Sequence, residues 1–151
     1  KRLDGVEDLM AELSAAVETL GDRLGPILLQ LPPYARKDAP RLRTFLESRP
    51  AALRAAFEFR HASWFDDEVF GILRDHDAAL CIADADDHLE VPFQPTADWG
   101  YLRLRRPDYD DAALQIWADR VREQNWREAF VFFKHEDDGK GPKMAARYLE
   151  L

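Results

Sequence analysis

Residues 26–33 read Pro-Ile-Leu-Leu-Gln-Leu-Pro-Pro, a short apolar run closed by two prolines. Because proline has no backbone N–H and cannot continue a ladder, this run predicts a buried strand that ends before the prolines. A helical pattern follows, with Asp38 as a suitable N-cap and with Leu42 and Phe45 on one face. The stretch therefore predicts one strand followed by one helix.

The same strand–helix unit recurs along the chain. Further strands are expected at residues 55–60, 79–83, 100–105 and 129–133. Helices are expected to begin at Asp66 or Asp67, at Asp110 or Asp111, and at Pro142. A first helix with capping-box spacing, Asp4 to Glu7, comes before all of them without a strand of its own. Strands that alternate with helices in this way predict an α/β protein with a parallel sheet.

Two architectures fit such an alternation, a doubly wound open sheet and a closed barrel. No Gly-rich nucleotide-binding loop follows any predicted strand, which disfavours the open dinucleotide-binding fold. A complete TIM-type barrel needs about 250 residues, and five eighths of that is roughly 155. We therefore predict that residues 1–151 form a single domain, the last five strand–helix units of a (β/α)8 barrel.

Composition narrows the classes of partner. The net charge is −8, with 29 acidic and 21 basic residues, so nucleic acid is possible as a partner but disfavoured. Cys81 is the single cysteine, which favours a reducing compartment, and we expect a cytoplasmic protein. No apolar stretch approaches the ~20 residues that cross a membrane, so no membrane partner is expected.

Five motifs resemble, in order, those of the YecE-like family, known as domain of unknown function 72. The motifs are Gly25-Pro26-Ile27-Leu28-Leu29-Gln30-Leu31-Pro32-Pro33, Phe57-Glu58-Phe59-Arg60-His61 with Ser63-Trp64, Cys81-Ile82-Ala83-Asp84, Asp98-Trp99-Gly100-Tyr101-Leu102-Arg103-Leu104-Arg105, and Phe132-Phe133-Lys134-His135. The resemblance covers essentially the whole chain. It implies a TIM-type barrel in a bacterial, cytosolic protein of uncharacterised activity. It also implies that the strands expected here are the fourth to the eighth, and that the family's first three strands are absent.

Polar side chains are expected near the carboxyl end of each strand. In residues 101–105, Leu102 and Leu104 form the apolar set, so Tyr101, Arg103 and Arg105 should point into the barrel. By the same alternation, Phe57 and Phe59 should point outward, and Glu58 and Arg60 inward. The expected ring consists of Gln30, Glu58, Arg60, Asp84, Arg103 and Lys134. Barrel enzymes place their chemistry at this end, so the ring is the candidate site.

The residue types of the ring suggest acid–base chemistry on an anion. Glu58 and Asp84 are candidate general acid and base, and Lys134 is the third candidate catalytic residue. The candidate substrate-binding residues are Gln30, Arg60, His61, Trp64, Tyr101, Arg103 and His135. The arginines would hold a phosphate or a carboxylate, so a small anionic ligand is the expected partner. The alternative is that buried Glu–Arg pairs serve only to close a layer of the barrel.

Metal and nucleophile chemistry have less support. His61, Asp84, Asp86, His88 and His135 are the possible metal ligands, but no close pair has helical ligand spacing. We therefore assign no metal, and the cofactor stays unknown. Ser63 lies near His61 in sequence, yet no Gly-x-Ser-x-Gly elbow is present.

Three classes of function stay open. The first is an enzyme that acts on a small anionic or phosphorylated, sugar-like substrate. The second is a module that grips a nucleic-acid backbone, or a metal-dependent barrel that cleaves phosphodiesters, using Arg60, Arg103, Arg105, Arg106 and Lys134. The third is a noncatalytic or partial domain whose open edge pairs with another chain. The sequence does not determine the oligomeric state.

Overall fold

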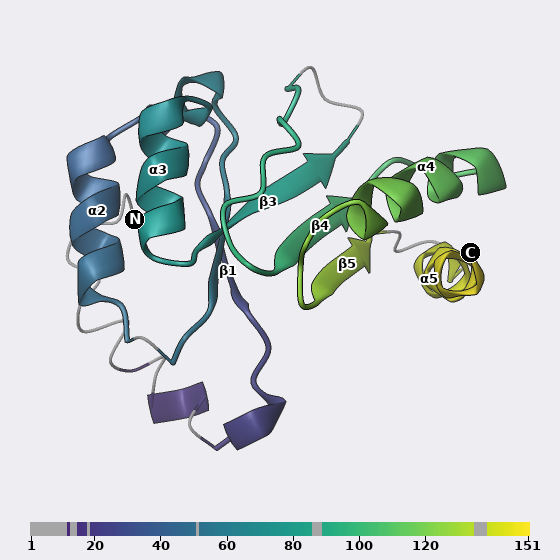
Figure 1. The fold of residues 1–151 in the computed structure, drawn as a ribbon, viewed down its shortest axis with the longest axis horizontal. Coiled ribbons are helices and arrows are strands. Elements are labelled where there is room, and N and C mark those ends of the chain that lie inside the picture. Colours follow the sequence, from purple (N-terminus) through teal and green to yellow (C-terminus); the bar gives the residue numbers. More distant parts are fainter. Residues whose placement is uncertain (1–11, 13–14, 18, 51, 86–88, 135–138) are drawn as a thin grey trace.

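Five parallel strands form the sheet in the computed structural model, which describes residues 12, 15–17, 19–50, 52–85, 89–134 and 139–151 (Figure 1). They pair in chain order: β1 (Ile27–Gln30), β2 (Ala55–Glu58), β3 (Ala79–Asp84), β4 (Gly100–Leu104) and β5 (Ala129–Phe133). Every neighbouring pair is parallel. The carboxyl ends of all five strands therefore lie at one edge of a curled sheet, and the predicted α/β class is confirmed.

The helices follow the strands as the sequence pattern predicted. They are α2 (Ala39–Ser48), α3 (Asp67–Asp75), α4 (Asp111–Arg122) and α5 (Lys140–Glu150), with 3₁₀ turns η1 (Gly21–Arg23) and η2 (Ala62–Trp64). Asp38, Asp66 and Asp110 each accept a hydrogen bond from the backbone N–H three residues later, so the predicted N-caps are confirmed. The helix expected after Asp4 falls largely outside the described residues.

Two boundaries differ from the sequence expectation by two residues. The last helix begins at Lys140 rather than Pro142, because Gly139 adopts the left-handed conformation, φ 63°, and turns the chain into the helix. Strand β2 ends at Glu58 rather than Arg60, and the chain then turns into η2. Between β3 and β4 the described residues contain no helix, which agrees with the long loop predicted there.

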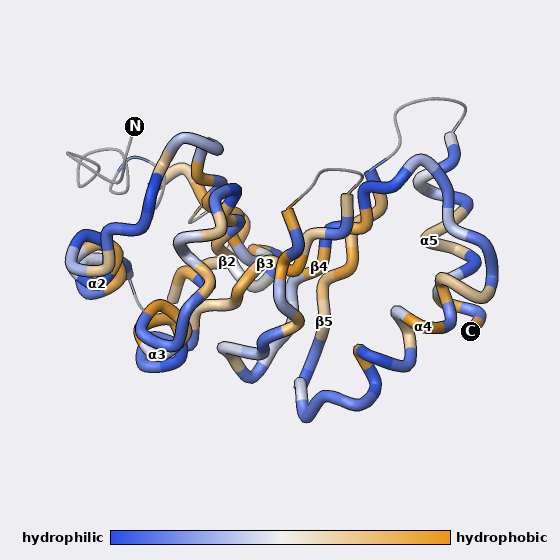
Figure 2. The backbone as a smooth tube through the Cα atoms, turned by 90° about the horizontal axis from the view of Figure 1, so that it is seen from above, coloured by the Kyte–Doolittle hydropathy of each residue, from blue (hydrophilic) through white to orange (hydrophobic). Residues whose placement is uncertain are grey.

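The helices α2, α3, α4 and α5 of the described residues pack on one side of the sheet (Figure 2). Phe57, Phe59 and Leu80 pack there in one core with residues of α2 and α3, so the predicted outward direction of both phenylalanines is confirmed. Farther along the sheet, Leu104 joins a second core with α4 and α5. We call this side of the sheet the helix face.

The opposite side of the sheet, the inner face, has a smaller apolar core. It consists of Ala56, Ala79, Cys81, Trp99 and Tyr101. Among the described residues, no helix is both long enough and apolar enough to cross a membrane.

Candidate functional site

Glu58, at the carboxyl end of β2, is the centre of a polar cluster on the inner face. Its side chain is 2% exposed. Gln30 Nε2 donates a hydrogen bond to Oε1 at 2.7 Å, and Arg103 donates one to Oε2. Arg105 Nη1 forms an ion pair with Oε1 at 3.6 Å. We call Gln30, Glu58, Arg103 and Arg105 the Glu58 cluster.

The sheet register brings these residues together. Gln30 is the direct partner of Glu58 where β1 pairs with β2. Arg103 alternates with the helix-face residues Leu102 and Leu104, so it projects from the inner face of β4. Arg105 continues that alternation just beyond the strand, where its backbone N–H donates to the Asp84 carbonyl at 2.7 Å.

Neutral groups form the floor beneath the cluster. Burial raises the pKa of the Cys81 thiol, and the nearby Glu58 charge raises it further. Burial is also the main cause that raises the pKa of Tyr101, whose ring lies 5.0 Å from the Phe132 ring. Both groups therefore keep their protons at neutral pH. The charge of the cluster comes from one carboxylate and two guanidinium groups, which leaves an excess of positive charge.

Asp84 does not belong to this cluster, and the predicted shared ring of Glu58 and Asp84 is corrected. In the register Asp84 pairs with Leu104, which packs on the helix face. The Asp84 carboxylate, 9% exposed, accepts a 2.8 Å hydrogen bond from Arg106 Nε and a 2.9 Å bond from the Tyr109 hydroxyl. Both faces of β3 are apolar, so alternation did not determine the direction of Asp84.

The Asp84 environment also perturbs its tyrosine partner. Burial is the main cause that raises the pKa of Tyr109, although the backbone N–H of Arg106, which donates to its hydroxyl, acts in the opposite direction. The hydroxyl therefore stays protonated and donates to the carboxylate. With two donors on a buried carboxylate, Asp84 joins the end of β3 to the segment that precedes α4.

The remaining charged residues of the predicted ring, Arg60 and Lys134, form no hydrogen bond or ion pair with Glu58. Arg60 shares the alternation of Glu58 and is half-buried, but it has no hydrogen bond or ion pair with the described residues. Lys134 directly follows β5, and its backbone N–H donates to the Leu104 carbonyl at 3.0 Å. His135 falls outside the described residues.

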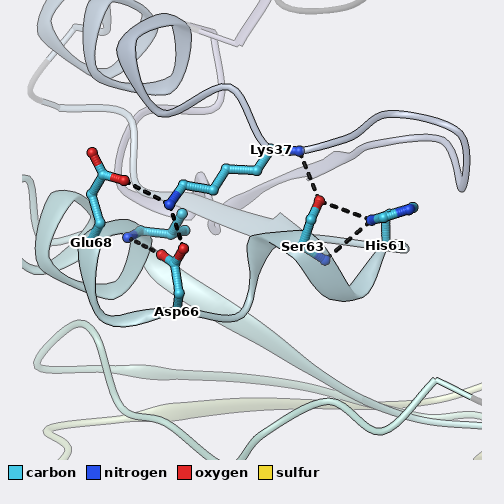
Figure 3. Close-up of polar contacts among 6 residues, drawn as sticks. Lys37, His61, Ser63, Asp66 and Glu68 are labelled. Carbon is cyan, nitrogen blue, oxygen red and sulfur yellow. Dashed lines mark hydrogen bonds and ion pairs between the residues drawn. The ribbon is translucent and has the colours of Figure 1, made fainter.

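His61 and Ser63 meet in a second polar group that holds the β1–α2 loop (Figure 3). The Ser63 hydroxyl lies 2.8 Å from His61 Nδ1, which also accepts the Ser63 backbone N–H at 3.1 Å. The Lys37 backbone N–H donates to Ser63 Oγ at 2.9 Å, and the Lys37 ammonium reaches Asp66 and Glu68. The hydrogen bond from Lys37 is the first cause that lowers the pKa of Asp66.

Trp64, a predicted substrate-binding aromatic, lies in the core on the helix face, away from the Glu58 cluster. Its side chain is 1% exposed and stacks on Phe59, with ring centroids 4.5 Å apart and planes inclined by 4°. Its indole N–H donates to the Ala35 carbonyl at 2.8 Å. The preceding Phe59 already belongs to the helix face, and the turn η2 keeps Trp64 on that side.

The sequence carried no signal strong enough to place two residues of these polar groups, Arg105 and Lys37. Arg105 was expected to point inward but was not assigned to the ring, because only the pairing of β2, β3 and β4 brings it to Glu58. Lys37 sits in a loop without periodicity, so nothing predicted its contacts. Of the possible metal ligands, His61 and Asp84 lie in separate groups and Asp86, His88 and His135 are not described; the described residues contain no group of three.

A family model described as "Protein of unknown function DUF72" matches residues 1–151. A DUF72 family protein from Thermotoga maritima has a crystal structure with a TM-score of 0.84 and 24% identity, covering 96% of this chain. A DUF72 family protein from Enterococcus faecalis has a TM-score of 0.73 and 16% identity over 91% of this chain.

The relatives are longer than this chain. The chain spans 65% of the Thermotoga maritima protein and 66% of the Enterococcus faecalis protein. No curated protein matches it. At these identities the solved structures establish the fold.

Proposed function

This chain belongs to the DUF72 family of proteins of unknown function. We propose that it contributes the anion-binding half of a site for a small anionic or phosphorylated substrate. The observation that carries the proposal is the Glu58 cluster on the inner face. One buried carboxylate there faces two guanidinium groups at the carboxyl ends of parallel strands. Such an excess of arginine favours a phosphate or carboxylate ligand, which guanidinium groups bind with paired hydrogen bonds.

The proposed setting is an eight-stranded barrel that the whole protein closes. Consecutive parallel strands with α2, α3, α4 and α5 on one side favour a barrel, because a doubly wound sheet has helices on both faces. In a barrel the inner face becomes the interior, and the Glu58 cluster lies at the end where barrel enzymes bind substrate.

Packed side chains occupy the inner face near the amino ends of the strands. Arg54, which precedes β2, lies over the rings of Trp99 and Phe130, 5.1–5.6 Å from their centroids. Glu128 forms an ion pair with the same guanidinium. This packing favours a site at the carboxyl ends of the strands over one at their amino ends.

Within this proposal the residues have distinct roles. Arg105 is the primary anion ligand, because its ion pair with Glu58 is the longer of the two and its side chain is 22% exposed. Arg103 and Gln30 hold Glu58 in place. When a ligand displaces Arg105 from Oε1, that oxygen keeps its hydrogen bond from Gln30 and has its second lone pair available to take a proton, so Glu58 is the candidate acid–base group.

The test is calorimetric titration of the full-length protein with inorganic phosphate and with ribose 5-phosphate. We expect Arg105→Ala to weaken binding at least about tenfold, as expected for loss of a charge-assisted hydrogen bond. Arg122→Ala, which removes an exposed arginine of α4, should leave binding unchanged. Equal affinities for all three proteins, or no binding of either anion to the wild type, would overturn the proposal.

A second measurement separates chemistry from binding. Phosphorus NMR follows ribose 5-phosphate with wild-type protein and with Glu58→Gln. If Glu58 transfers protons, the variant binds the sugar phosphate but loses turnover. If the wild type binds without turnover, the function is binding alone and the acid–base role of Glu58 is wrong.

A further inference from the structure

We propose that a pocket between the β1–α2 loop and η2 binds a small amphipathic anion, in which one carboxylate or phosphate group is joined to a ring or a short aliphatic chain. The pocket has a volume of about 300 Å³. That volume lies at the lower limit of small-molecule sites, which range over roughly 300–1,000 Å³. It is a site separate from the Glu58 cluster and does not depend on the function proposed for that cluster.

The floor of the pocket is apolar. It consists of Leu31, Ala35 and Trp64, which all belong to the core on the helix face. Tyr34, 67% exposed, lines the same pocket. An inorganic ion would leave this floor without a partner, whereas a ring or a short hydrocarbon chain would remove it from water.

The rim of the pocket carries an excess of positive charge. Arg36, Lys37 and Arg41 line it together with one carboxylate, Asp38. Asp38 accepts the Arg41 backbone N–H at 3.1 Å and forms an ion pair with its guanidinium at 3.4 Å.

The other two cations, Lys37 and Arg36, differ in whether carboxylates already neutralise their charge. Lys37 is neutralised, because its ammonium contacts both Asp66 and Glu68. Arg36 is exposed and has no hydrogen bond or ion pair with the described residues, so its charge is available. A ligand that satisfies both the floor and the rim is therefore an anion with an apolar part.

The pocket is already formed without a ligand. Trp64 Nε1 donates to the Ala35 carbonyl at 2.8 Å, and the Lys37 N–H donates to Ser63 Oγ at 2.9 Å, so η2 holds the loop at two points (Figure 3). The Ala35 N–H closes a turn on the Pro32 carbonyl at 2.9 Å. Little ordering entropy is lost when a ligand enters a loop held in this way. The contact between Ser63 and His61 thus serves to shape the pocket.

The experiment titrates the full-length protein with two aromatic anions, phenylacetate and phenyl phosphate. Ligand-detected NMR measures the binding of each probe. Acetate tests the anionic group alone, and 2-phenylethanol tests the ring alone. We expect each aromatic anion to bind at least about tenfold more tightly than acetate or 2-phenylethanol, because only the aromatic anions contact both the floor and the rim of the pocket. Phenylethanol binding as tightly as phenylacetate would overturn the proposal, and so would absence of binding by both aromatic anions.

Variants locate the binding. Arg36→Ala should weaken phenylacetate binding about tenfold, whereas Arg43→Ala, an exposed arginine of α2 outside the pocket lining, should not change it. Arg105→Ala removes the anion ligand proposed for the Glu58 cluster, so phenylacetate binding that survives this substitution occurs outside that cluster. Phenylacetate binding that is lost with Arg105→Ala and kept with Arg36→Ala would show that the pocket proposal is wrong. A chemical-shift map that places phenylacetate away from Ala35 would do the same.

Discussion

Arg103 donates a hydrogen bond to Oε2 of Glu58, a buried carboxylate that lies 45 residues earlier in the chain. Gln30 and Arg105 interact with the other oxygen. The carboxylate therefore links β1, β2 and the end of β4, and it is the only negative charge that the two arginines share within this cluster of described residues.

Glu58→Gln should lower the free energy of unfolding by about 1–3 kcal/mol, because it leaves two guanidinium groups without their counter-charge. The loss stays below that of a fully buried pair, since Arg103 and Arg105 are 20% and 22% exposed and can reach water. Urea denaturation of the full-length protein measures it. The control is Glu47→Gln on the exposed side of α2, and equal unfolding midpoints for the two variants would contradict the prediction.

Gly100→Ala should destabilise the protein by about 1–3 kcal/mol through overpacking. A Cβ at this position would lie 2.5 Å from Cε3 and Cζ3 of the Trp126 ring, so the indole must move. Thermal or urea unfolding tests this against Gly25→Ala, where a Cβ would have no heavy atom within 4 Å. The prediction fails if the Gly100 variant is as stable as the Gly25 variant.

Tyr109→Phe should cost about 1–2 kcal/mol, because it removes one of the two side-chain donors to the buried Asp84 carboxylate. Tyr148→Phe is the matched control, since that hydroxyl has no hydrogen bond with the described residues. A double-mutant cycle with Asp84→Asn should give a non-zero coupling energy for Tyr109 and none for Tyr148. Additive effects at Tyr109 and Asp84 would refute their interaction.

Stability should fall as the pH rises above about 9. Burial raises the pKa of Cys81 above its ordinary value of 9.0, and the pKa values of Tyr101 and Tyr109 above 10.0. Above these ordinary values the unfolded chain releases protons that the folded chain retains, so the unfolded state gains stability. Urea titrations from about pH 8 to about pH 11 measure the slope. Cys81→Ala should make the decline in stability shallower. Stability that stays constant over this pH range would contradict the raised pKa values.

Asp66→Ala should lower the free energy of unfolding by about 1 kcal/mol, mainly because α3 loses the side chain that accepts the Val69 N–H at 2.9 Å. Asp66→Asn keeps an acceptor and should cost less. The pKa of Asp66 is lowered from 3.8, first by its hydrogen bond from Lys37, so its contribution is present above that value and is lost as the pH falls below it. Acid titration of Asp67→Asn, an exposed neighbour, should match the wild type, whereas both Asp66 variants should lose less stability in acid.

Local chemistry explains what could be predicted. An N-cap bond joins an aspartate to an N–H three residues later, so Asp38, Asp66 and Asp110 were identifiable from sequence alone. The alternation around Phe57 and Phe59 likewise determined on which face Glu58 lies. In β3 both faces are apolar, so the same argument failed for Asp84.

The amino-acid sequence by itself determined the strand–helix units, their caps and the faces of the amphipathic strands, because these depend on hydrogen bonds and periodicities within a few residues. Tertiary structure alone decided which residues from distant parts of the chain meet. It paired Arg105 with Glu58, turned Asp84 towards Tyr109, buried Trp64 on Phe59, and brought Lys37 to Ser63. Those contacts depend on the register between neighbouring parallel strands and on the path of the loops between them, and both are set by the packing of the whole sheet against its helices.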